Sequence, residues 1–178
     1  MSSLKQFKII KLLGKGSYSK VYKVRRIQNG DIYALKKVKL GKLTRKEKEN
    51  SLNEVRILAS IKHPYIISYK EAFYDKRESC LCIVMEYAGS GDMLNKIRQF
   101  KKKKYFPEKL IWKYLIQLIK ALKKLHDMKI LHRDLKCANV FISKDEKRVK
   151  LGDLNVSKVA KKGLVKTQTG KITAFWFI

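Results

Sequence analysis

The segment HRDLKCAN, at residues 132–139, places four kinds of chemistry-bearing side chain within a few positions of one another. Asp134 is a carboxylate that can accept or orient a hydroxyl proton, and Lys136 is a cation that can neutralise a transferring phosphoryl group. Asn139 offers a neutral oxygen ligand for Mg²⁺, and Asp153, after the short predicted strand VKLG, adds an anionic one. Each residue alone has an ordinary structural explanation, but their combination in this order predicts a phosphoryl-transfer site.

A second group of candidates begins with the glycines of LGKGSYSKV. Gly14 and Gly16 would let the backbone approach an anion closely, because a Cβ would hold phosphate oxygens away from the amide donors. The signal is weak by itself, since Ser19 stands where the third glycine of G-x-G-x-x-G would be. A turn with two glycines between strands is more often only a hairpin. A dinucleotide-binding fingerprint is also disfavoured, because it needs a strand followed by a helix.

A lysine and a glutamate extend this group. In the predicted strand YALKKV, Ala34 and Lys36 share one face by alternation, and a buried ammonium group requires a carboxylate partner. Glu54 lies on the edge of the apolar stripe of the next predicted helix and can supply that carboxylate. Lys37 and Lys39 should point the other way, into solvent. The expected arrangement is a small sheet with a phosphate site on one face.

The N-terminal elements follow from short strand-like segments and their turns. Residues 7–13, 20–27 and 31–40 are rich in β-branched or aromatic side chains, and Asn29-Gly30 is a strong hairpin signal. Residues 45–62 read as a helix that ends before Pro64. The pattern predicts two further strands, at 66–73 and 80–87, and an apolar helix stripe made of Leu52, Val55, Leu58 and Ala59.

The sequence changes character after AGSGD, at residues 88–92, which is the one plausible domain boundary. Pro107 suits the first turn of a helix that continues to His126. Its apolar residues recur every three or four positions and predict a buried helix: Leu110, Tyr114, Leu118, Leu122 and Leu125. The chain therefore reads as a strand-rich part followed by a helical part, an α+β fold.

These motifs together resemble those of a eukaryotic protein kinase, from about Phe7 to Gly170. The resemblance covers the glycine-rich loop, the lysine strand, the helix glutamate, the HRDLKCAN loop and GDLN at the D-F-G position. Lys136 in HRDLK is similar to the serine/threonine branch, and EVRILASIKHP and KTQTG are similar to NIMA-related (Nek) kinases. The resemblance implies a two-lobed fold, with an N-lobe at 1–87, a hinge at 86–92 and a C-lobe at 92–178.

The resemblance also implies that ATP and Mg²⁺ are cofactors and that a protein hydroxyl is the substrate. Lys36, held by Glu54, would position the α and β phosphates, and Asn139 with Asp153 would hold the metal. Met85 would be the gatekeeper of the nucleotide site. Adenine would meet the backbone of Glu86 to Ala88 between apolar walls, which the resemblance places at Val21, Ala34 and Phe141 or its neighbours.

Two departures from the family pattern stand out. Asn155 replaces the glycine of D-F-G and Leu154 replaces its phenylalanine, while Asp153 is retained. After KTQTG the chain reads KITAFWFI, where the family continues with an A-P-E segment and further helices. We therefore expect a C-terminally truncated kinase with an incomplete C-lobe. The alternative is a nucleotide-binding pseudokinase or a mis-predicted gene fragment with little activity.

Composition leaves a third class of function open. The 178 residues carry 43 Lys and Arg against 15 Asp and Glu, a net charge of +28. Such an excess suits a basic nucleic-acid or microtubule-binding module, but the lysines are spread along the chain, so no specific nucleic acid is expected. Cys80 and Cys82 should face one side of a strand as small hydrophobes. Without a signal peptide or membrane span, the predicted location is cytoplasmic, with cytoskeletal or ciliary association by family resemblance.

Overall fold

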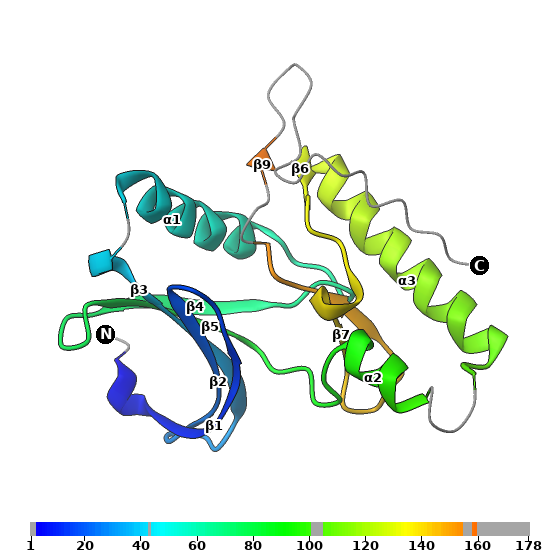
Figure 1. The fold of residues 1–178 in the computed structure, drawn as a ribbon, viewed down its shortest axis with the longest axis horizontal. Helices are drawn as coiled ribbons and strands as arrows, with labels where there is room; N and C mark the ends of the chain where they lie inside the picture. Colours follow the sequence, from blue (N-terminus) through cyan, green and yellow to red (C-terminus); the bar gives the residue numbers. More distant parts are fainter. Residues whose placement is uncertain (1–2, 43, 101–104, 155–157, 160–178) are drawn as a thin grey trace. The chain divides into compact units, whose positions relative to one another are not determined.

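The computed structural model describes residues 3–42, 44–100, 105–154 and 158–159 of the chain. These residues divide into two compact units, at 1–88 and 89–178 (Figure 1). The predicted hinge at 86–92 includes that division. The glycine-to-asparagine exchange at Asn155 and the terminal KITAFWFI lie outside the described residues.

The first unit is built on one antiparallel sheet of five strands, in the order β1-β2-β3-β5-β4. Helix α1 (Arg45–Ser60) connects β3 to β4. Short 3₁₀ turns precede β1 and α1, at Leu4–Gln6 and Leu40–Lys42. The strands are β1 (Phe7–Lys15), β2 (Ser19–Arg26), β3 (Ile32–Lys39), β4 (Tyr69–Asp75) and β5 (Cys80–Glu86). The predicted strands are all present, and the α+β class is confirmed.

The turn between β2 and β3 has the chemistry expected of Asn29-Gly30. Gly30 adopts a positive φ of 75°, which an L side chain rarely does, and its N–H donates to the Arg26 carbonyl at 2.9 Å. The side chain of Asn29 accepts a hydrogen bond from the backbone N–H of Asp31 at 3.1 Å. The predicted hairpin is therefore confirmed.

One face of the sheet encloses an apolar core. Phe7 of β1 stacks on Phe73 of β4, with ring centroids 6.2 Å apart, so the two edge strands approach each other and the sheet is strongly curled. Cys80 and Cys82 lie in this core with their Sγ atoms 3.6 Å apart, as the alternation predicted. Burial raises the pKa of the Cys82 thiol well above its ordinary value, so both cysteines act as small hydrophobes.

The apolar stripe of α1 differs from the predicted one. Leu58 is buried, but Leu52 is 47% exposed and Ala59 is also exposed. The helix instead buries Ile57 and Leu58, together with Ile61 just beyond its end. Burial follows the larger side chains at i, i+1 and i+4, and these define a face rotated from the one expected.

Lys37 corrects a second expectation. Its side chain is only 12% exposed, and its Nζ forms an ion pair with Glu78 and lies 5.9 Å from the ring centroid of Tyr22. Although burial opposes the charge, the hydrogen bond and charge of Glu78 raise the pKa of Lys37 above its ordinary value. Lys39 is exposed, as predicted.

The described part of the second unit combines two helices with two small two-stranded sheets. Helix α2, which the sequence did not predict, begins after Asp92, whose carboxylate accepts from the backbone N–H of Asn95 at 2.9 Å. Strand β6 pairs with β9, and β7 pairs with β8. The elements are α2 (Met93–Phe100), α3 (Glu108–Asp127), β6 (Ile130–Leu131), a 3₁₀ turn (Cys137–Asn139), β7 (Val140–Ile142), β8 (Val149–Leu151) and β9 (Lys158–Val159).

Helix α3 has a buried face and a second apolar face that is exposed. Tyr114, Leu118 and Leu125 of the predicted stripe are buried. The helix is not buried all round, however, since four large apolar side chains are 40–55% exposed: Ile111, Trp112, Ile116 and Ile119. None of the helices within the described residues has the length and apolar character that crossing a membrane requires.

We predict that Gly30→Ala lowers the free energy of unfolding by about 1 kcal/mol, because alanine is strained at a positive φ. Gly41→Ala is the matched control, since a Cβ has open space at both positions and only Gly30 has a positive φ. The control should change stability by less than about 0.5 kcal/mol. Urea unfolding of both variants tests this, and equal losses would contradict it.

Candidate active site

Two predicted catalytic residues, Asp134 and Lys136, meet the predicted metal ligand Asn139 in the loop between β6 and β7. The Asp134 carboxylate accepts a hydrogen bond from Lys136 Nζ at 2.7 Å and one from Asn139 Nδ2 at 3.0 Å, both on Oδ2. Asn139 Nδ2 also donates to the Asp134 carbonyl at 2.8 Å. A carboxylate, a cation and an amide therefore form one connected cluster, as the HRDLKCAN segment predicted.

His132 fastens this loop to the end of β8. It is 3% exposed, and its Nε2 lies 3.0 Å from the Gly152 carbonyl while its Nδ1 lies 3.4 Å from the backbone N–H of Asp134. Because a carbonyl can only accept and an N–H can only donate, the ring carries its proton on Nε2. Burial lowers the pKa of His132 below its ordinary value, against the smaller opposing effect of the Gly152 carbonyl. The neutral ring is therefore a structural link.

The hairpin of β7 and β8 brings the two predicted metal ligands to one end. Asn139 immediately precedes β7, and Asp153 follows β8 by two residues. Val140 pairs with Leu151, and the N–H of Gly152 donates to the Asn139 carbonyl at 3.0 Å. Antiparallel pairing therefore places residues that are 14 positions apart in the sequence on neighbouring strand ends.

The donor set at this end suits a hard cation. Asp134 engages the amide nitrogen of Asn139, which leaves the amide oxygen as the atom that can face a metal. Within the described ranges, no three His, Cys, Asp or Glu side chains gather as a metal site. Mg²⁺ is commonly held by one or two protein oxygens together with phosphate and water. The residues therefore fit Mg²⁺ that arrives with a phosphate ligand.

Two backbone positions in this region are strained. Arg133 has φ 63° and Asp153 has φ 59°, both in the left-handed region that non-glycine residues seldom adopt. One precedes the Asp134 carboxylate and the other carries a predicted metal ligand. Strain of this kind persists only where surrounding contacts fix the chain, and it gathers at functional sites.

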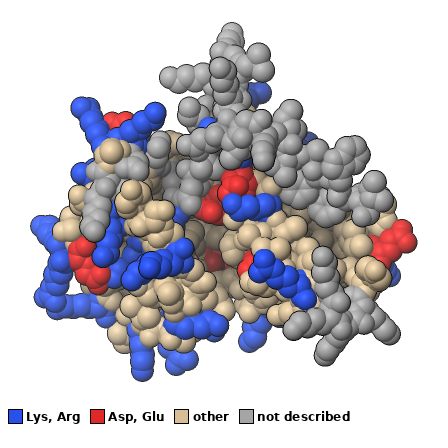
Figure 2. Space-filling model, viewed as in Figure 1, with Lys and Arg blue, Asp and Glu red and all other residues tan. Residues whose placement is uncertain are grey.

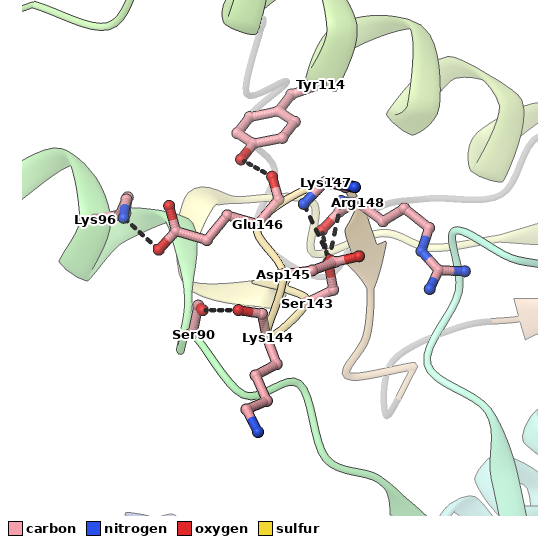
Figure 3. Close-up of polar contacts among 9 residues, drawn as sticks. All are labelled: Ser90, Lys96, Tyr114, Ser143, Lys144, Asp145, Glu146, Lys147 and Arg148. Atoms are coloured by element: carbon pink, nitrogen blue, oxygen red, sulfur yellow. Dashed lines mark hydrogen bonds and ion pairs between the residues drawn. The ribbon is translucent and has the colours of Figure 1, made fainter.

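The turn of the β7–β8 hairpin is anchored from several sides (Figure 3). Tyr114 of α3 donates its hydroxyl hydrogen to the Glu146 carbonyl at 2.8 Å, and Lys96 of α2 pairs with the Glu146 carboxylate at 2.6 Å. Ser90 Oγ lies 3.4 Å from the Lys144 carbonyl. The hairpin end opposite the candidate metal ligands is thus held by both helices of this unit.

Gln117 is a functional support that the sequence analysis missed. It is 7% exposed, its Nε2 donates to the Lys147 carbonyl at 3.1 Å, and its Oε1 accepts from the Val149 N–H at 2.8 Å. One amide therefore satisfies a donor and an acceptor of the hairpin at once. A polar residue between Tyr114 and Leu118 of a buried stripe was the available signal, because buried amides need partners.

The predicted phosphate-binding lysine lies in the first unit. Lys36 is 6% exposed on β3, where it pairs across the ladder with Val21 of β2, and Ala34 lies on the same face. Glu54 belongs to α1, but its side chain lies outside the described residues. The Lys36–Glu54 ion pair therefore stays a prediction.

Of the two glycines, Gly14 lies near the end of β1 and Gly16 lies in the turn between β1 and β2. Gly14 pairs with Val21, and a Cβ added to it would meet no atom within 4 Å. The N–H of Gly16 donates to the Ser19 carbonyl at 2.8 Å, which closes the turn. Neither packing nor a positive φ demands a glycine at position 14, so the space over it is available to a ligand.

The predicted adenine-binding segment begins at the end of β5. Met85 pairs with Ala34 of β3, which places both on the face that carries Lys36. The N–H of Glu86 donates to the Ser68 carbonyl at 2.9 Å, and its carboxylate accepts from the Ser68 N–H at 3.2 Å. The Glu86 N–H is thus engaged within the protein, and the adenine contact with Glu86 to Ala88 stays a prediction.

Residues 7–177 match the family model described as the protein kinase domain, so the match extends beyond Gly170, where the resemblance was expected to end. The probable serine/threonine-protein kinase nek2 of Dictyostelium discoideum is 36% identical over 89% of this chain and 39% of its own length. The serine/threonine-protein kinase Nek1 of Mus musculus is 39% identical over 83% and 12%. The G2-specific protein kinase fin1 of Schizosaccharomyces pombe is 34% identical over 93% and 26%. The chain spans well under half the length of these relatives.

We predict that Gln117→Leu lowers the free energy of unfolding by about 1–3 kcal/mol, because it removes this partner from the partly buried Lys147 carbonyl and from the buried Val149 N–H. Gln99→Leu, at an exposed position of α2, makes the same chemical change and should shift stability by less than about 0.5 kcal/mol. Urea unfolding measures both. A loss no larger at Gln117 than at Gln99 would remove the role assigned to this amide.

A second prediction concerns acid. In the unfolded chain, His132 binds a proton once the pH falls below its ordinary pKa of 6.5. In the native protein the same ring stays neutral until the pH falls below its lowered pKa. Stability should therefore be complete above about pH 6.5, fall as the pH is lowered, and level off below the native pKa. His132→Asn should remove this slope, whereas His126→Asn, at an exposed position, should retain it. Identical slopes in the two variants, measured by urea unfolding at each pH, would contradict the prediction.

Proposed function

Because the chain belongs to the protein kinase family and resembles its NIMA-related members, we propose that it transfers the γ-phosphoryl group of Mg²⁺-ATP to a serine or threonine hydroxyl of a protein. The observation that carries the proposal is the contact cluster of Asp134, Lys136 and Asn139. The β7–β8 pairing supports it, because it sets Asp153 beside that cluster's end of the hairpin.

Asp134 is the residue that would receive the attacking hydroxyl. Its Oδ2 is engaged by Lys136 and Asn139, so these contacts fix the orientation of the carboxylate and leave Oδ1 to accept the hydroxyl proton. The hydroxyl oxygen forms the new bond to the γ-phosphorus as the bond to the β–γ bridging oxygen breaks, and ADP leaves. Lys136, at 2.7 Å from Asp134, is placed to offset negative charge on the group in transfer.

The metal site of the proposal uses the hairpin end. The amide oxygen of Asn139 and the carboxylate of Asp153 would hold Mg²⁺, which when bound neutralises charge on the β and γ phosphates. His132 and Gln117 support these two ligands without touching them, the first at the Gly152 carbonyl and the second at the hairpin turn.

The nucleotide would be held by the predicted residues of the first unit. Lys36, with Glu54 as its partner, would contact the α and β phosphates, and Gly14 and Gly16 would let backbone amides approach them. Val21, Ala34 and Met85 would form apolar walls for adenine, whose edge would meet the backbone of Glu86 and Ala88. A protein substrate and an intracellular location complete the proposal.

We predict that Asp134→Asn lowers kcat by about a hundredfold or more while the affinity for Mg²⁺-ATP changes less than about threefold. The asparagine keeps the shape of the side chain and loses the proton acceptor. Lys36→Met should weaken nucleotide binding as well as transfer, and Lys39→Met, at an exposed position of the same strand, should do neither. Radiolabelled phosphate transfer to a generic protein substrate and nucleotide titration give the two readouts.

The outcomes separate the proposal from its rival. Transfer that survives in Asp134→Asn would overturn the catalytic assignment. Nucleotide binding that depends on Lys36, without transfer by the unmodified chain, would instead identify a nucleotide-binding pseudokinase. Failure of both would leave the family membership as a relation of fold alone.

A further inference from the structure

The first two strands carry cations that face one another across the ladder. Lys8 of β1 pairs directly with Arg25 of β2, and Lys11 pairs directly with Lys23. Arg25 and Lys23 are two residues apart on one strand, so the four side chains share one face of the sheet. We call Lys8, Lys11, Lys23 and Arg25 the cation row.

The cation row is costly to the fold as it stands. Like charges directly opposite each other on neighbouring strands are destabilising. The first thirty residues contain no Asp or Glu, and within the described part of the chain no ion pair neutralises the cation row. Lys23 has partial compensation, since its Nζ lies 4.7 Å from the ring centroid of Tyr87. Other cations of this unit are paired, Arg26 with Glu71 and Lys37 with Glu78.

Protection of a sheet edge does not explain the arrangement. Edge strands often carry lysines and bulges that prevent pairing with another chain, and β1 is an edge strand with two bulges. That reason accounts for Lys8 and Lys11. It does not account for Lys23 and Arg25, because β2 is paired on both sides.

We propose that the cation row is the docking surface for an acidic segment of a partner protein. Charge complementarity gives the sign of the partner. On the face drawn in Figure 2, Lys and Arg side chains gather where Figure 1 draws the strands and α1 of the first unit, and acidic side chains are few there. The proposal does not depend on phosphoryl transfer.

The surroundings of the cation row favour a peptide over a nucleic acid. Along β1, the aliphatic residues at the two bulges, Ile10 and Leu13, are 44% and 40% exposed next to the lysines. Ile9 and Leu12 pair with Val24 and Tyr22 and lie on the other face. Single-stranded nucleic acids are usually bound by aromatic platforms on which bases stack. Phe7 of β1 is buried, and the half-buried ring of Tyr87 is already covered by Lys23 Nζ at 4.7 Å. Alternating aliphatic and cationic groups fit an acidic segment that also carries apolar side chains.

The acidic segment must come from outside these residues. In the 178-residue sequence the one pair of adjacent acids is Asp145-Glu146. Both are already engaged, since Asp145 accepts from Ser143 Oγ at 2.5 Å and Glu146 pairs with Lys96 at 2.6 Å. We therefore assign the acidic segment to a partner protein.

The test measures binding of a fluorescein-labelled oligoglutamate peptide to the chain by anisotropy at low salt, with an oligoglutamine peptide as the neutral probe. The variant K8E/K11E turns both facing pairs into opposite-charge pairs, so its melting temperature should equal or exceed that of the unmodified chain. Its peptide affinity should nevertheless fall about tenfold, as two reversed charges each cost about threefold.

The matched control is K46E/K48E, which makes the same change in net charge at exposed positions of α1. Its peptide affinity should fall less than about twofold. If the two double variants lose equal peptide affinity, the effect comes from net charge alone, and the proposal is overturned. Oligoglutamate binding no better than that of oligoglutamine would overturn it as well. A single-stranded RNA of equal charge that binds more tightly and shows the same loss in K8E/K11E would assign the surface to nucleic acid instead.

Discussion

The antiparallel pairing of β7 with β8 is the constraint on which the candidate site depends. It sets Asn139 and Asp153 at neighbouring strand ends, and three side chains from outside the hairpin hold it in place. His132 holds its open end through Gly152, while Gln117 and Tyr114 hold its turn. A short hairpin is marginally stable by itself, so its geometry is set by the helix and loop that pack against it. The positions of the candidate site residues thus depend on buried side chains that take no part in the proposed reaction.

Local sequence signals were sufficient for the elements and for the chemical residue types. Asn29-Gly30 specified its hairpin because few other dipeptides adopt that turn, and alternation placed Cys80 and Cys82 on one buried face. HRDLKCAN specified a cluster because its residues are close in sequence. What failed depended on distant partners. Lys37 is covered because Glu78, 41 residues away, pairs with it. Helix α2 is a different kind of omission, because the capping residue Asp92 and the apolar residues Met93, Leu94, Ile97 and Phe100 at helical spacing were a local signal for it.

The charged side chains of the first unit are distributed unevenly between the two faces of its sheet. On the enclosed face, Arg26 lies 5.0 Å from the ring centroid of Phe7 and 5.2 Å from that of Tyr33, and it is neutralised by Glu71. On the other face, the cation row lies beside Val21, Ala34 and Lys36, with which it shares the β1–β2–β3 ladder. Because Arg26 lies on the enclosed face, its charge needs the carboxylate of Glu71, whereas the cation row is in contact with solvent and can remain charged. The same three strands therefore carry an apolar core on one side and a strongly positive surface on the other.

The buried pair of cysteines has a consequence for how the motions of this sheet can be observed. Thiol reagents attack the thiolate, and Cys82 is both 0% exposed and held in its protonated form by its surroundings. Its alkylation therefore requires that β5 first separate from the strands around it. The rate of labelling therefore measures how often the strand that ends at Met85 and Glu86 separates, without any label placed on the face of the sheet that carries Lys36.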